Sequence, residues 1–104
     1  MEQNLKTKPV FTLSVTADLL GIHPRTLMFY EREKLITPAR TKTGRKLFSK
    51  LDISLLQFIR YLTEKKRINT AGVKVVLELL KKVKSTNPKL KQEFFYDFEE
   101  KELI

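Results

Sequence analysis

Four cationic side chains surround a single glycine in the segment 40–46, and the chemistry they suggest is the binding of phosphate groups. The cations are Arg40, Lys42, Arg45 and Lys46, and the glycine is Gly44. Glycine permits the positive φ of a tight turn, so we expect a two-stranded ribbon that displays these cations on one small loop. The alternative is that these charges are only solvated, on a hairpin that would accept many other side chains.

A second group of polar side chains opens the segment 24–32, ahead of the ribbon. Pro24 suits the first position of a helix, because its missing N–H would lack a helical partner there in any case. Arg25, Thr26 and Phe29 would then face outward on this helix. The exposed N-terminal turn of a helix with such side chains can contact base edges in the major groove of DNA.

The wider segment 14–32 predicts two short helices joined by a tight turn. Ser14 is a natural N-cap for the first helix, and Gly21 ends it after about two turns. Leu27 and Tyr30 would turn the apolar side of the second helix inward. Helix pairs of this kind also occur in bundles that bind no nucleic acid, so the spacing alone leaves both interpretations open. The cationic ribbon that follows favours a helix-turn-helix with a wing.

The side chains that could support catalysis or bind a metal are few. His23 is the only histidine and cannot build a metal site alone. It suits the N-cap of the second helix or a hydrogen bond to a backbone phosphate. The absence of cysteine excludes disulfides and thiolate metal sites. No paired carboxylates and no nucleophile with a base are present, so we expect no enzyme, no cofactor and no metal.

The charge balance agrees with a nucleic-acid partner. The chain has 104 residues, a formal net charge of +9 and a pI near 9.9. Residues 93–104 carry five acidic residues against Lys101 alone, a net charge of −4, which leaves +13 for residues 1–92. No apolar run approaches the roughly 20 residues that span a bilayer, and no signal peptide is visible. We therefore expect a cytoplasmic, nucleoid-associated protein.

Two further helices should support the helix pair. Ser49 and Asp52 have the spacing of a capping box, and the apolar stripe behind them predicts a core helix. Its members are Ile53, Leu56, Ile59 and Leu62. Lys66 and Arg67, beyond its end, are either a solvated helix terminus or a second set of phosphate contacts. Asn69 is a good N-cap for a fourth helix, which should run from Thr70 to about Lys84.

The C-terminal segment is rich in phenylalanine. Residues 85–88 break the helical pattern, and a last short helix should follow. It would hold Leu90, Phe94 and Phe98 on one side, with Phe95 beside them. So short a helix cannot hide three phenylalanines within itself. We expect these four side chains to form a two-fold dimer contact; the alternative is that they close over the core of their own chain.

The expected organisation is mainly α: a winged helix-turn-helix with a small β-hairpin wing and a short C-terminal helix. Residues 1–10 would be a flexible N-terminal arm, residues 11–84 the DNA-binding domain, and residues 85–104 the element that dimerises or packs.

In its order of motifs the chain resembles the MerR family of bacterial transcription regulators, over roughly residues 11–80. The matching residues are Leu13-Ser14-Val15, Gly21-Ile22-His23-Pro24-Arg25-Thr26-Leu27, Phe29-Tyr30-Glu31-Arg32, Leu35-Ile36, Pro38-Ala39-Arg40, Gly44 and Leu47-Phe48-Ser49. Within the family the chain is most similar to the heat-shock repressor (HspR-like) branch, through His23-Pro24 and the segment 68–74.

This resemblance implies a homodimer that binds an inverted repeat in double-stranded promoter DNA. Arg25, Thr26 and Phe29 would lie at the groove, with Tyr30 near the DNA backbone. Arg40 and Lys46 would hold phosphates, and Ser14 belongs to the matched pattern beside the DNA. The family usually has arginine where this chain has Met28, and its metal and drug sensors have a longer C-terminal helix.

The heat-shock branch further implies a repressor with a chaperone co-repressor of the DnaK type. Two other classes remain open from the residues alone. One is an architectural or excisionase-like protein of a mobile element, which bends DNA in recombination. The other is a protein-interaction module whose basic face binds an acidic partner or RNA.

Overall fold

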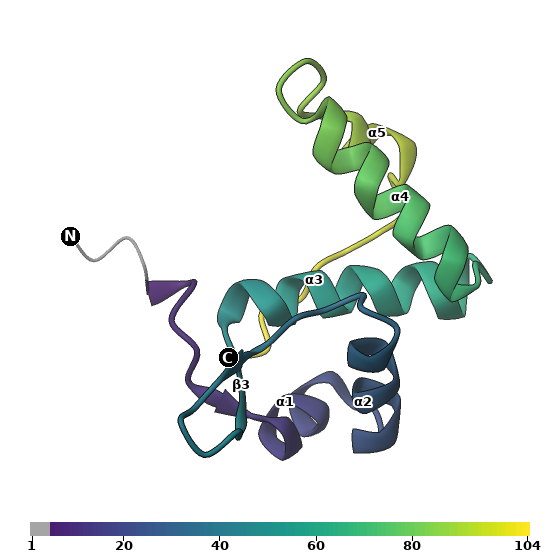
Figure 1. The fold of residues 1–104 in the computed structure, drawn as a ribbon. Helices are drawn as coiled ribbons and strands as arrows, with labels where there is room; N and C mark the ends of the chain where they lie inside the picture. Colours follow the sequence, from purple (N-terminus) through teal and green to yellow (C-terminus); the bar gives the residue numbers. More distant parts are fainter. Residues whose placement is uncertain (1–4) are drawn as a thin grey trace.

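A helix-turn-helix and a small antiparallel sheet pack against one central helix, and a helical arm projects away from them (Figure 1). The computed structural model describes residues 5–104. In chain order the elements are β1 (Phe11–Thr12), α1 (Leu13–Leu20), α2 (Pro24–Arg32), β2 (Ala39–Arg40), β3 (Lys46–Phe48), α3 (Lys50–Arg60), the π-helical turn η2 (Tyr61–Lys65), α4 (Thr70–Val83) and α5 (Leu90–Phe94). The mainly helical, winged architecture predicted from the sequence is confirmed.

The helix pair forms as predicted, except at its first cap. Gly21 ends α1 in the left-handed region with φ of 70°. Ser14 is not the N-cap, because it lies inside the first turn of α1. Thr12 caps the helix instead, and its hydroxyl accepts a hydrogen bond of 3.2 Å from the backbone N–H of Val15. An N-cap residue has an extended backbone, which Thr12 has with φ of −70° and ψ of 169°, whereas Ser14 already belongs to the helix.

The predicted ribbon becomes a three-stranded sheet. Its strand order is β1-β3-β2, with both pairs antiparallel. The opposed residues are Phe11 with Phe48, Thr12 with Leu47, Ala39 with Leu47, and Arg40 with Lys46. The β1 strand had no sequence signal, because two residues are too few to show an alternating pattern.

Part of the expected N-terminal arm is held against the domain. The N–H of Val10 donates to the carbonyl of Phe48, and the N–H of Leu51 donates to the carbonyl of Lys6, each at 3.0 Å. Within the expected flexible arm, Lys6 and Val10 thus bond to the domain, and residues 1–4 lie outside the described part.

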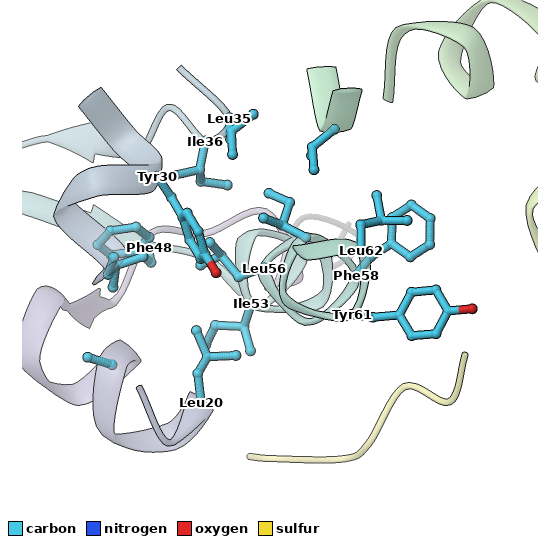
Figure 2. Close-up of a cluster of buried hydrophobic side chains, with 14 of the residues drawn as sticks. Leu20, Tyr30, Leu35, Ile36, Phe48, Ile53, Leu56, Phe58, Tyr61 and Leu62 are labelled. Carbon is cyan, nitrogen blue, oxygen red and sulfur yellow. The ribbon is translucent and has the colours of Figure 1, made fainter. Parts of the chain in front are cut away.

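The central helix α3 starts at the predicted capping box and carries core side chains on two sides. The Ser49 hydroxyl accepts from the N–H of Asp52 at 3.1 Å, and the Asp52 carboxylate accepts from the N–H of Ser49 at 3.0 Å. In Figure 2, Phe48 and Tyr30 lie on one side of this helix and Phe58 and Tyr61 on the other. The predicted apolar stripe is buried throughout, at 2% exposure or less.

The fourth helix, α4, is capped by Asn69 as predicted, since the Asn69 side chain accepts from the N–H of Gly72 at 2.9 Å. The C-terminal segment departs from expectation. Helix α5 ends at Phe94 and therefore excludes Phe98, and the chain then returns along α3 (Figure 1). Gln57 fixes this return, because its side-chain amide exchanges two hydrogen bonds of 3.0 and 2.9 Å with the backbone of Lys101.

Candidate nucleic-acid interface

The first turn of α2 presents the side chains that were expected at the DNA groove. Arg25 is exposed, Thr26 is half-buried, and Phe29 keeps 39% of its surface exposed. The guanidinium of Arg32 lies 5.9 Å from the centre of the Phe29 ring, which leaves the outer face of α2 cationic and aromatic together. Met28, at 41% exposure, lies on the open surface of the same helix.

His23 is the N-cap of α2. Its Nδ1 accepts a hydrogen bond of 3.0 Å from the backbone N–H of Arg25. A neutral imidazole that accepts at Nδ1 carries its proton on Nε2, where it is a donor. The same ring can therefore cap α2 through Nδ1 and donate to a phosphate oxygen through Nε2.

Tyr30 faces inward, as the sequence predicted, but the place that the resemblance implied for it requires a correction. The resemblance implied a place near the DNA backbone, but the side chain is only 4% exposed and belongs to the core (Figure 2). Its hydroxyl lies 3.3 Å from the hydroxyl of Thr63, in the π-helical turn η2 that follows α3. The aromatic ring is large and apolar, so burial with a hydrogen-bonded hydroxyl is more favourable than exposure.

The wing turn has the predicted conformation, with φ of 85° at Gly44. The N–H of Thr41 donates to the carbonyl of Arg45, and the N–H of Gly44 donates to the carbonyl of Thr41, each at 2.9 Å. Lys42 and Arg45 are exposed on this turn. They supply the cationic surface that the sequence predicted there.

The other two wing cations are held by a carboxylate of α2. Lys46 Nζ lies 2.5 Å from Glu31 Oε1, and Arg40 Nη2 lies 2.7 Å from Glu31 Oε2. Burial by itself would raise the pKa of Glu31, but the hydrogen bond and charge of Lys46, together with Arg40, outweigh burial and lower that pKa. Both cations therefore face an anion of their own chain.

The cations beyond α3 differ from each other. Lys66 is paired with Asp97 at 3.2 Å, and its Nζ lies 5.6 Å from the centre of the Tyr61 ring. Arg67 is exposed and has φ of 60°, the left-handed conformation with which the chain leaves η2. Both side chains are exposed, but Lys66 already faces a carboxylate of its own chain.

The phenylalanines of the C-terminal segment divide into two groups. Phe95, at 8% exposure, and Phe98 pack against Phe58 with ring centres 5.3 and 5.1 Å away. These two residues therefore close over the core of their own chain, which corrects their assignment to a dimer contact. Phe94 is 70% exposed, and Leu90 is half-buried. Phe95 can reach the core because the backbone leaves the helix at that residue, with φ of −103° and ψ of 55°.

Glu31 and Asp97 were not singled out as site residues from the sequence. Glu31 lies nine positions from Arg40 and fifteen from Lys46, so no helical or strand periodicity links them. Its only signal was its place in the motif Phe29-Tyr30-Glu31-Arg32. Asp97 was counted only as part of an acidic run.

Residues 5–104 lack the features of two other kinds of site. No group of three or more histidine and acidic side chains there could hold a metal ion. In the same residues, none of the helices has the length and apolar character needed to cross a membrane.

The helix pair α1 and α2, followed by a cationic hairpin wing, defines this chain as a winged helix-turn-helix protein. The model of the MerR HTH family of regulatory proteins matches residues 11–80, which is more than half of the chain. The protein belongs to the MerR family.

Named relatives agree with this assignment. A putative heat shock protein HspR of Streptomyces coelicolor is 42% identical over 71 residues, which cover 68% of this chain and 47% of that protein. The HTH-type transcriptional regulator GlnR of Bacillus anthracis is 34% identical over 93 residues, which cover 89% of this chain and 70% of that regulator. The HTH-type transcriptional regulator TnrA of Bacillus subtilis is 31% identical over 58 residues, 56% of this chain and 53% of TnrA. The chain thus spans about half the length of its Streptomyces relative.

Proposed function

We propose that this chain is a transcription regulator that binds a specific inverted-repeat operator as a homodimer and represses the promoter by occupying it. One observation carries the proposal. The exposed first turn of α2, with Arg25 and Thr26, and the wing turn, with Lys42 and Arg45, belong to two elements that touch each other through Glu31. A groove-reading helix and a phosphate-binding loop are thereby presented together.

Within this surface, the chemistry of each side chain determines whether it contacts bases or phosphates. Arg25 can donate two parallel hydrogen bonds to a guanine edge, and such a contact contributes about 1–3 kcal/mol of discrimination. Lys42 and Arg45 can neutralise phosphates, which releases counterions and makes the affinity fall with salt. Sequence preference therefore comes from α2, while the wing adds affinity for any duplex.

The test begins with selection of bound duplexes from a random pool, with stoichiometry measured on the same complexes. We expect a symmetric site bound by two chains. Arg25→Ala should then weaken binding to the selected site and relax its sequence preference. Lys42→Ala should weaken all duplexes alike and reduce the salt slope by about one unit.

The matched control is Lys82→Ala, which removes the same charge from an exposed position in the last turn of α4. It should leave the sequence preference unchanged. Selection that yields no symmetric site, together with strong bending of phased sites, would instead support an architectural DNA-bending protein. If Arg25→Ala keeps the full sequence preference of the wild type, the assignment of α2 to the DNA groove is wrong.

Repression and the chaperone partner rest on the resemblance to the heat-shock branch. We expect the dimer on its operator to block transcription in a purified system, and a DnaK-type chaperone to strengthen that block. Activation of the same promoter by the dimer would contradict the repressor assignment.

A further inference from the structure

The wing is joined to the recognition helix by a single carboxylate that has one cation on each oxygen. Glu31 Oε2 accepts from Arg40 of β2, and Glu31 Oε1 pairs with Lys46 of β3. The Glu31 side chain is 17% exposed, against 22% for Lys46 and 51% for Arg40, so the carboxylate is the least exposed of the three groups. Both strands of the wing are therefore bound to α2 by the same residue.

Arg40 extends this connection to the tip of the wing. Its Nη1 donates a hydrogen bond of 3.0 Å to the carbonyl of Gly44, while its Nη2 donates to Glu31. The guanidinium thus bridges α2 and the turn that carries Lys42 and Arg45. Strand β2 has only two residues, and a ribbon this short is marginal by itself. The bridge supplies part of the order that the strand pairing lacks.

We propose that Glu31 is a positioning residue for DNA recognition, which fixes the wing on α2 so that groove contacts and phosphate contacts are presented in one geometry. The inference rests on the proposed function, because it concerns the same DNA contact. Arg40 and Lys46 are long, flexible side chains, and ordering them before DNA arrives lowers the entropy cost of binding. The carboxylate also offsets part of their charge, which limits binding to any phosphate backbone.

These two effects predict that the loss of Glu31 changes the affinity for a random duplex and for the operator differently. In Glu31→Gln, the wing and both cations are released. Binding to a random duplex should tighten, with a salt slope steeper by about one unit, because the released cations can neutralise phosphates. Binding to the selected operator should gain less or weaken. The ratio of the two affinities should fall about tenfold, the scale of one good base contact.

Glu33→Gln is the matched control. Glu33 has the same charge, lies two residues further along at the C-cap of α2, and contacts Thr70 at 3.4 Å rather than the wing. This variant should leave the affinity ratio unchanged. If Glu31→Gln tightens both duplexes by the same factor, Glu31 acts only as a repelling charge and the proposal is overturned. Parallel weakening on both duplexes, with loss of thermal stability, would also overturn it.

A measurement without DNA separates this inference from the proposed function. Amide hydrogen exchange of Thr41, Gly44 and Arg45 reports the order of the wing turn, whose N–H groups are bonded within the turn. Glu31→Gln should speed exchange at these three amides, with amides of α3 as the internal reference, and Glu33→Gln should not. Unchanged exchange would overturn the positioning role. Failure of the wild-type chain to bind any duplex would refute the proposed function alone, because the exchange result would still stand.

Discussion

Lys66 and Asp97 form an ion pair of 3.2 Å that joins the end of the central helix to the returning C-terminal segment. The hydroxyl of Tyr61 donates to the other oxygen of the same carboxylate. This hydrogen bond is the main reason that the pKa of Asp97 is lowered, while burial and the nearby carboxylate raise the pKa of Tyr61. An expected phosphate ligand, Lys66, is thus occupied by an acid of its own chain.

The variant Asp97→Asn should lose the part of the unfolding free energy that depends on the ionised Asp97 carboxylate. The folded-state pKa of Asp97 lies below its ordinary value of 3.8, so its contribution is fully present above that value and is lost as the pH falls through the lowered pKa. Denaturant unfolding of the wild type between pH 7 and 2.5 should therefore show a decline below about pH 4 that is shallower in Asp97→Asn. Glu99→Gln, at an exposed neighbouring position, is the control and should retain the wild-type decline. Equal slopes for wild type and Asp97→Asn would contradict the assignment.

Adjacent phenylalanines should differ strongly in their effect on folding. Phe95→Ala should lower the free energy of unfolding by about 3 kcal/mol or more, because it empties a site packed against Phe58 and Tyr61. For the monomer, Phe94→Ala should change it by less than about 0.5 kcal/mol, since that ring is largely exposed in the single chain. Both values can be measured by urea denaturation. Similar losses for the two variants would show that the segment is packed differently.

The exposed aromatic side chains of the C-terminal segment are the surface that we expect in the dimer. Phe94 and Tyr96 are 70% and 83% exposed. The double variant Phe94→Ala/Tyr96→Ser should shift the chain toward monomer in sedimentation equilibrium and reduce operator affinity. Leu79→Ser, which changes an exposed apolar residue on α4, is the control. If Leu79→Ser dissociates the dimer and the double variant does not, the contact runs through α4.

The cap of α1 can be tested with two conservative changes. Thr12→Val keeps the β-branched shape but removes the hydroxyl that accepts from Val15, so it should cost about 1 kcal/mol of stability. Ser14→Ala should change the unfolding free energy by less than about 0.5 kcal/mol, because Ser14 lies exposed within the helix. Thermal or urea unfolding distinguishes the two, and a larger loss from Ser14→Ala would restore Ser14 as the cap.

Much of the local structure could be predicted because its causes lie a few residues apart. The caps at His23, Ser49 and Asn69 join a side chain to an N–H two or three positions later. Gly21 and Gly44 adopt the positive φ that the turns require. The apolar stripe of α3 faces the core at helical spacing. The exposure of Arg25 in the first turn of α2 follows from the same local rules.

Only the tertiary structure decided which distant side chains meet. Sequence spacing gave no sign that Glu31 would hold Arg40 and Lys46, or that the hydroxyl of the inward-facing Tyr30 would meet Thr63. It also left open whether Phe95 and Phe98 would pack on their own chain. Residue type determines which partners a side chain suits, and many residues here suit each other: 21 cations share 12 carboxylates. The path of the whole chain brings one pair within contact distance and separates the rest, because the burial of the core fixes that path.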